Sequence, residues 1–162
     1  MMQARTRTAE VKRVIMRPPS PDDLEVSAVM TMKADARRVA NALAITEYMD
    51  AWMHMPETDE FLCTAPDVAP DQFGFDLYSS RKLRSSIRGY CLLSTAEHLV
   101  YVWSKAPCGA VRETVVDIHL QQVSDQCTVK LKHSGLSSMT ESLWHATMWK
   151  RSLENLRRLM EA

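Results

Sequence analysis

Five histidines are the side chains of this sequence best suited to acid–base or metal chemistry, because imidazole titrates near neutral pH and ligates transition metals. They are His54, His98, His119, His133 and His145. No two of them form an HExxH pattern or stand four residues apart, the spacings at which a helix presents two metal ligands on one face. We therefore predict no metal site and no cofactor, and we expect His98 and His119 to face solvent.

His133 differs from the other four because it shares the two-residue alternation of Cys127, Val129 and Leu131 along a predicted strand. That alternation predicts a side chain that points inward. In an apolar cavity the imidazole could exchange a hydrogen bond with a ligand and change its charge near neutral pH. Alternatively, it bonds only the backbone at the turn that follows the strand.

Nucleophilic catalysis and nucleotide binding have little support in this sequence. The four cysteines show no CxxC spacing, and without a secretory signal we interpret them as reduced thiols: Cys63, Cys91, Cys108 and Cys127. There is no GxSxG motif, and four glycines are too scattered for a loop that cradles phosphate. Asp76 and Glu113 are candidates for an acidic general base. An error of one residue in a predicted strand would move a side chain to the other face of the sheet, so either carboxylate could point inward. The sequence assigns no catalytic residue and favours a role without catalysis.

Short strands and one long helix must position these side chains. Alternating apolar and polar residues predict seven strands, at 24–32, 59–64, 73–78, 85–93, 97–104, 112–123 and 126–133. Two short helices follow the first strand, one starting at Asp35 and one capped by Thr46 and ending at Trp52. Short links between successive strands indicate an antiparallel meander.

The last predicted element is an amphipathic helix over residues 139–161. Ser138 and Glu141 form a capping box at its start. Its apolar stripe, at helical spacing, comprises Leu143, Ala146, Trp149, Leu153, Leu156 and Met160. A long helix laid across a curved sheet usually leaves a space between the two, and we expect function to reside there.

Length and charge limit the classes of function. The chain has 162 residues, 46% of them apolar and 25% charged, which suits one domain with a hydrophobic core. The formal net charge is zero and gives no indication of nucleic acid as a partner. No apolar run approaches the roughly 20 residues of a membrane span, and the start lacks a signal-peptide pattern, so we expect a cytoplasmic protein. We divide the chain into a flexible basic arm over 1–23 and a domain over 24–162.

Several motifs, taken in order, resemble the START-like or SRPBCC superfamily, which has the helix-grip fold. One strand ends in Tyr101-Val102-Trp103, and the last strand runs into His133-Ser134-Gly135-Leu136, similar to the family's L-x-H-x-G-L turn. Trp149, Leu153 and Leu156 fit the family's W-x-x-x-L-x-x-L helix. Within the superfamily, the chain resembles the branch that includes the carboxy-terminal domain of heat-shock ATPase activator co-chaperones. The resemblance covers residues 24–161.

This resemblance implies an α+β protein whose curved, seven-stranded antiparallel sheet wraps around the long C-terminal helix, with two short helices after the first strand. Members bind lipids, hormones, polyketides or other apolar molecules in the space between sheet and helix. Some members catalyse cyclisation or dehydration there, and some are co-chaperones, so the fold does not select the function. Because the family motif places a histidine at position 133 across these functions, we favour the backbone bond for His133.

For this chain we predict a START-like ligand-binding domain over 24–162 that holds a small hydrophobic or amphipathic molecule, as a carrier or a sensor. The predicted ligand-binding residues are Met30, Trp52, Tyr101, Trp103, Ile118, Leu131, His133 and Trp149. The aromatic members could equally fill the same space as a core cluster. The alternative functions are a cyclase- or dehydratase-like enzyme that uses the same cavity and a stress-related co-chaperone. A homodimer is compatible with all three.

Overall fold

The computed structural model describes residues 24–58, 60–64, 72–106 and 113–162. The arm predicted over 1–23 lies outside the described residues. The elements are, in chain order, β1 (Leu24–Met32), α1 (Ala36–Ala44), α2 (Thr46–Trp52), β2 (Glu60–Thr64), β3 (Gln72–Ser79), β4 (Lys82–Ser94), β5 (His98–Ala106), β6 (Thr114–Val123), β7 (Gln126–Leu136) and α3 (Met139–Glu161). This is the predicted succession of one strand, two helices, six strands and a long helix.

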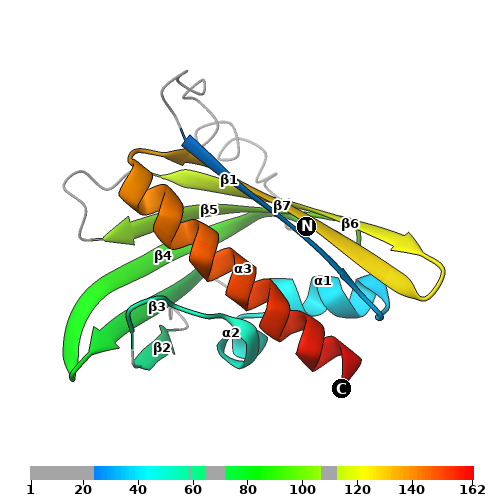
Figure 1. The fold of residues 1–162 in the computed structure, drawn as a ribbon, viewed down its shortest axis with the longest axis horizontal. Helices are drawn as coiled ribbons and strands as arrows, with labels where there is room; N and C mark the ends of the chain where they lie inside the picture. The colour runs from blue at the N-terminus through cyan, green and yellow to red at the C-terminus, as the bar shows by residue number, and fades with distance from the viewer. Residues whose placement is uncertain (1–23, 59, 65–71, 107–112) are drawn as a thin grey trace, which may run out of the picture.

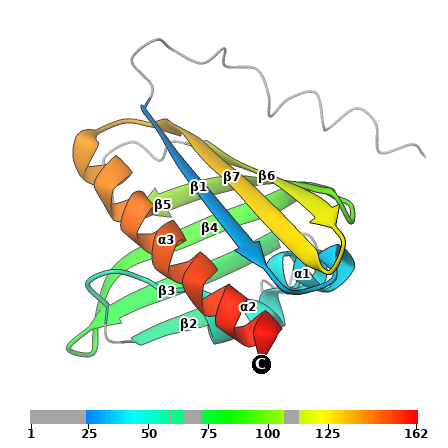
Figure 2. The same cartoon turned by 45° about the vertical axis from the view of Figure 1, so that its right-hand side comes forward.

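The strands form one antiparallel sheet with the order β1-β7-β6-β5-β4-β3-β2. The sheet is curved, and α3 crosses its concave face and contacts β1 (Figure 1). Helices α1 and α2 lie at one end of the same face, beside the C-terminal half of α3 (Figure 2). The helix-grip fold predicted from the sequence is confirmed. No helix in the described part of the chain is long and apolar enough to cross a membrane.

Alternation along each strand decides which side chains enter the space under α3. On β5, Leu99, Tyr101 and Trp103 are buried, and on β7 the same alternation buries Leu131 and His133. Burial of each large apolar side chain contributes about 1.5–3 kcal/mol. The inward orientation predicted for His133 is confirmed.

Helix α3 begins as predicted but turns a different face to the sheet. The Ser138 side chain accepts a hydrogen bond from the Glu141 backbone N–H at 3.2 Å. The predicted stripe is wrong at its first position, because Leu143 is 63% exposed. The buried residues are Ser142, His145, Met148, Trp149, Ser152, Leu153, Leu156 and Met160. A stripe drawn through apolar residues alone omits the three polar ones, which α3 brings into the space between helix and sheet.

The starts of the two short helices differ in how they are capped. The helix predicted to start at Asp35 begins at Ala36, and the Asp35 side chain caps it by accepting from the Arg37 N–H at 2.8 Å. The cap predicted for α2 is wrong, since Thr46 is already its first helical residue and Ile45 stands at the cap position without a side-chain acceptor. Helix α2 therefore depends on packing for its stability.

Two buried side chains hold the end of α1 against the core. The Tyr101 hydroxyl donates to the Leu43 carbonyl oxygen at 2.7 Å, and the Trp52 indole N–H donates to that of Ala42 at 2.9 Å. Both carbonyls lie in the last turn of α1, where no intrahelical donor remains. Tyr101 and Trp52 thus satisfy this helix end.

Only two residues separate β3 from β4, fewer than predicted, because a tight turn joins the two strands. Its two residues, Ser80 and Arg81, both have positive φ, at 51° and 63°. Such turns usually contain glycine or asparagine, and neither residue type stands here to mark the hairpin.

Gly89 in β4 lies beneath the ring of Phe73, its partner on β3. A Cβ atom at this position would overlap the Phe73 ring and the Val102 carbonyl oxygen. We expect Gly89→Ala to lower the free energy of unfolding by about 1–3 kcal/mol, because the ring and a strand must shift. Chemical denaturation measures the loss, with Ser94→Ala at the exposed end of the same strand as the control. A Gly89→Ala variant as stable as the control would contradict this packing.

Candidate functional site

His133 lies at the centre of a chain of hydrogen bonds that joins α3 to the sheet. The Trp149 indole N–H donates to Nδ1 of His133 at 3.0 Å, and Nε2 of His133 lies 2.7 Å from Oγ1 of Thr114. The Thr114 hydroxyl donates to the Trp103 carbonyl oxygen at 2.8 Å. Because Nδ1 accepts and the threonine proton is already used, Nε2 of His133 carries the imidazole proton.

His133 is uncharged at neutral pH. Burial lowers the pKa of His133 well below its usual range, and the neighbouring His145 lowers it further. The prediction that His133 bonds the backbone is wrong, because its two partners are the side chains of Trp149 and Thr114. Both ring nitrogens are therefore occupied, and His133 organises its neighbours.

His145 packs against His133 from α3, with ring centroids 4.6 Å apart and planes nearly perpendicular. Its Nδ1 lies 2.7 Å from the Glu141 carbonyl oxygen, which can only accept, so Nδ1 carries the proton. Burial lowers the pKa of His145 to about 4, against an opposing effect of Glu141. At neutral pH the ring is uncharged, and Nε2 presents a bare lone pair.

Three buried polar atoms beside these rings have no hydrogen-bond partner among the described residues: Nε1 of Trp103, Oγ of Ser142 and Nε2 of His145. Trp103 comes from the sheet, while Ser142 and His145 lie one turn apart on the buried face of α3. The rings of Trp103 and His145 are 6.3 Å apart. Each such atom costs about 1–3 kcal/mol if it stays unsatisfied. Three polar groups between helix and sheet are thus left for an ordered water or a ligand atom to satisfy.

A pocket of about 570 Å³ opens between α3, the segment after α2 and strands β3 to β5. Its lining residues are Pro56, Glu57, Thr58, Leu77, Ser79, Arg84, Ser85, Lys105, Thr140, Glu141 and Trp144. Two of them contact His145. Glu141 does so through its carbonyl oxygen, and Trp144 through its ring, whose centroid is 4.9 Å from that of the His145 ring. Glu141 and Trp144 therefore separate the pocket from His145 by one layer of side chains.

Lys105 stands at the rim of this pocket. Its Nζ lies 3.5 Å from the Glu141 carboxylate and 4.1 Å from the centroid of the Trp144 ring. Both charged side chains are mostly buried, with 15% and 19% of their surfaces exposed. The ion pair and the cation–π contact hold the rim in a defined position.

One comparison decides the family of this chain. The protein-family model described as Activator of Hsp90 ATPase homolog 1-like protein, AHSA1, matches residues 33–161. The chain belongs to this family. The match confirms the START-like branch inferred from the sequence motifs, and its range includes both the histidine cluster and the pocket. None of the curated proteins matches the chain.

Solved structures share the AHSA1-family fold of this chain. Protein CV1439 from Chromobacterium violaceum superposes with a TM-score of 0.67 at 18% identity, over 85% of this chain and 98% of its own. The Aha1 dimer from Colwellia psychrerythraea gives a TM-score of 0.61 at 16% identity, over 85% and 96%. DynU16, a protein of the dynemicin biosynthetic locus, gives 0.61 at 16%, over 83% of this chain and 46% of its own. At these identities the likeness is one of fold.

In this AHSA1-family chain, the residues predicted to bind a ligand lie mainly in the core. Trp103, His133 and Trp149 form one cluster, with ring centroids between 5.5 and 6.2 Å apart. Ile118 and Leu131 are cross-strand partners, Tyr101 and Trp52 bond α1, and Met30 is half-buried on β1. None of the eight lines the pocket described above. Their contact with a ligand stays a prediction.

Sequence reasoning missed the residues that α3 supplies to the site. Positions 142, 145, 149, 152 and 156 repeat every three or four residues, which defines a helix face once polar residues are included. A search for that spacing around Trp149 would have found Ser142 and His145. Lys105 and Trp144 carried no such signal, because their contact depends on how α3 crosses β5.

The two candidates for an acidic base lie outside the space under α3. Asp76 alternates with the buried Phe75 and Leu77 and bonds Arg88 at 2.8 Å, which lowers the pKa of Asp76. Glu113 is exposed just before β6.

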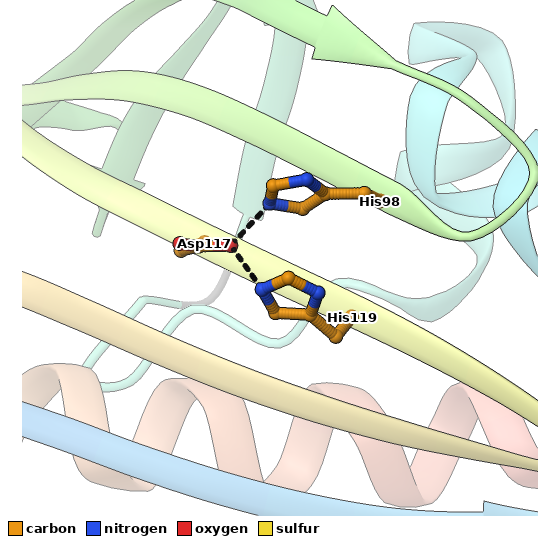
Figure 3. A group of neighbouring side chains, drawn as sticks. All are labelled: His98, Asp117 and His119. Atoms are coloured by element: carbon orange, nitrogen blue, oxygen red, sulfur yellow. Dashed lines mark hydrogen bonds and ion pairs between the residues drawn. The ribbon is translucent and has the colours of Figure 1, made fainter.

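The described residues include a group that could share a metal ion, and it lies on the other face of the sheet. His98, Asp117 and His119 alternate with the inward-facing Leu99 and Ile118 (Figure 3). This group is therefore separate from the buried histidine cluster.

Proposed function

We propose that this protein binds a small amphipathic molecule between its sheet and α3, with a hydroxyl group of that molecule placed at Trp103, Ser142 and His145. The observation that carries the proposal is the set of three unpaired polar atoms, with a pocket of about 570 Å³ on the far side of Glu141 and Trp144. Pockets of roughly 300–1,000 Å³ suit small organic ligands. Apolar parts of the ligand would contact Leu77 and Trp144 in the pocket.

The chemistry of the unpaired atoms supports a hydroxyl over other polar groups. The Trp103 indole N–H can only donate, and Nε2 of neutral His145 can only accept. A hydroxyl accepts from the first and donates to the second. A carboxylate has no proton to give Nε2, and an ammonium group has no lone pair for the indole.

Native mass spectrometry of freshly purified protein tests the proposal, by comparison of gentle with denaturing conditions. We expect a small molecule that stays on the folded chain and leaves on unfolding. Addition of n-decanol, decanoate or decane to the ligand-free protein then shows which polar group the site prefers, because the three molecules carry a hydroxyl, a carboxylate or no polar group. The proposal predicts that the alcohol raises the melting temperature most; equal effects of all three would leave no role for the hydroxyl.

Two buried serines on α3 should change the free energy of unfolding in opposite directions when each is replaced by alanine. Ser142 has an unpaired hydroxyl, whereas Oγ of Ser152 accepts from the His54 N–H at 2.8 Å. We expect Ser142→Ala to raise the free energy of unfolding of the ligand-free protein by about 1 kcal/mol and Ser152→Ala to lower it by about as much. Urea denaturation measures both. A loss of stability in Ser142→Ala would mean that the hydroxyl already has a partner in the ligand-free fold.

Catalysis in the same space is a second candidate, supported by the bare Nε2 of His145. A neutral buried imidazole can take a proton from a substrate hydroxyl or an acidic C–H group. The low pKa of His145, about 4, makes it a weak base. Mass spectrometry distinguishes the two functions: an enzyme would retain a different molecule in His145→Gln than in the natural protein, and a carrier would retain the same molecule or none.

The family description supports a third candidate, a stress-related co-chaperone that acts on an Hsp90-type ATPase. Stimulated ATP hydrolysis by such an ATPase on addition of this chain would establish it. We also propose a homodimer in the cytoplasm, in line with a related dimeric structure. Light scattering after gel filtration measures the mass and tests the dimer.

A further inference from the structure

The outer face of β5 and β6 carries three side chains that strand pairing brings together. His98 and His119 are direct cross-strand partners, and Asp117 lies two residues before His119 on the same face. Nε2 of His98 is 2.7 Å from Oδ1 of Asp117, and Nε2 of His119 is 3.2 Å from the same oxygen. Figure 3 shows both imidazoles turned toward the carboxylate.

The spacing of these atoms is close to that of a metal-binding site. One ligand atom from each residue lies within 4.8 Å of the other two. Around a tetrahedral zinc ion with bonds of about 2.0–2.1 Å, the ligand atoms stand roughly 3.4 Å apart. The two nitrogen–oxygen distances, 2.7 and 3.2 Å, are shorter than this, so the carboxylate and the rings must move apart to take an ion between them. The two rings are stacked with centroids 4.0 Å apart and planes at 16°, so the rings must tilt toward each other for both Nε2 lone pairs to point at one ion.

We propose that His98, Asp117 and His119 bind a divalent transition-metal ion of the zinc, nickel or copper type. Two imidazoles and one carboxylate favour these ions over magnesium and calcium, which prefer oxygen ligands alone. Each Nε2–H now faces Asp117; on metal binding the imidazole proton moves to Nδ1, and the lone pair of Nε2 binds the ion. The remaining coordination positions face solvent, since the His98, Asp117 and His119 side chains are 33%, 41% and 59% exposed.

Charged groups on the neighbouring strands limit the affinity of this site for a metal ion. Lys130 and Lys132 on β7 stand opposite His119 and Asp117, and their charges oppose a cation. Glu25 on β1 lies 3.3 Å from the ammonium group of Lys132 and offsets one of them. Glu97 precedes His98 and is exposed. We therefore expect an ion that exchanges with solvent, bound on the face of the sheet opposite to the proposed ligand site.

Titration of the full chain with zinc chloride, followed by ¹⁵N NMR of the histidine side chains, tests this site. We expect the signals of His98 and His119 to shift and to saturate at one equivalent, while those of His133 and His145 stay in place. Magnesium chloride should leave all the signals unchanged. Asp117→Asn should weaken zinc binding at least about tenfold, as loss of even an indirect metal contact does.

Two variants decide the outcome. His54→Gln, which removes a histidine outside the group, should bind zinc as the natural chain does. The double variant with His98→Gln and His119→Gln should show no stoichiometric binding, and its exposed positions make loss of folding unexpected. Zinc binding that survives in the double variant would overturn the proposal, because other groups would then hold the ion. Failure of the natural chain to saturate before zinc precipitates would overturn it as well.

Discussion

Lowering the pH from 6.5 to 4 is expected to reduce the free energy of unfolding by about 3 kcal/mol through His145 alone. Burial lowers the pKa of His145 in the folded chain to about 4, from the ordinary value of 6.5 that we assign to the unfolded chain. As the pH falls, the unfolded chain therefore takes up this proton first. The contribution of His145 to stability is complete above pH 6.5 and is lost as the pH approaches 4.

The surroundings of His145 set the size of this effect. Glu141 attracts the protonated ring from the same helix, and Lys105 on β5 repels it. His133 faces it from β7, and because burial also lowers the pKa of His133, protonation of His133 destabilises the fold with the same sign. The total loss should therefore exceed the value for His145 alone.

Urea denaturation at a series of pH values measures this loss. The interval from pH 6.5 to 5 is the most informative, since most carboxyl groups titrate below it; His145 should account there for about 2 kcal/mol. His145→Phe places an aromatic ring of similar size that cannot take up a proton, so its stability should change less over this interval. If the variant and the natural protein lost stability equally, His145 would not be the group responsible.

Local sequence patterns predicted the order of strands and helices, and the resemblance to the START-like family supplied their arrangement. Alternation on β1, β5, β6 and β7 predicted which faces of these strands point inward. Asp35 and Ser138 marked the starts of two helices, because capping depends on neighbours in sequence. The seven strands and the long helix followed from these patterns. The hairpin at Ser80 and Arg81 was missed, since its positive φ angles are imposed by the paired strands and not by the residue types.

The candidate site could be predicted only in part, because it depends on contacts between distant segments. The orientations of Trp103 and His133 follow from strand alternation alone. The partners of His133 do not: Trp149 reaches it only because α3 is rotated so that Leu143 faces solvent and His145 faces the sheet. In the same way, His98 and His119 are far apart in the chain and become neighbours through the register of β5 and β6.

The bond between Trp149 and His133 is expected to give the second large effect on stability. His133→Phe leaves the Trp149 indole N–H buried without an acceptor, and Trp149→Phe leaves Nδ1 of His133 without a donor and adds a small cavity. We expect each substitution to lower the free energy of unfolding by about 2–4 kcal/mol, from the unpaired group and the lost packing.

The double variant separates the hydrogen bond from the packing. Because both partners of the bond are then removed together, the double loss should be smaller than the sum of the single losses by about 1–3 kcal/mol. Trp52→Phe supplies the control: its indole donates to the Ala42 carbonyl oxygen and shares no partner with His133. Trp52→Phe and His133→Phe should therefore be additive to within about 0.5 kcal/mol. Additivity of the Trp149 pair as well would show that this bond contributes nothing, and that α3 is held to the sheet by apolar contact alone.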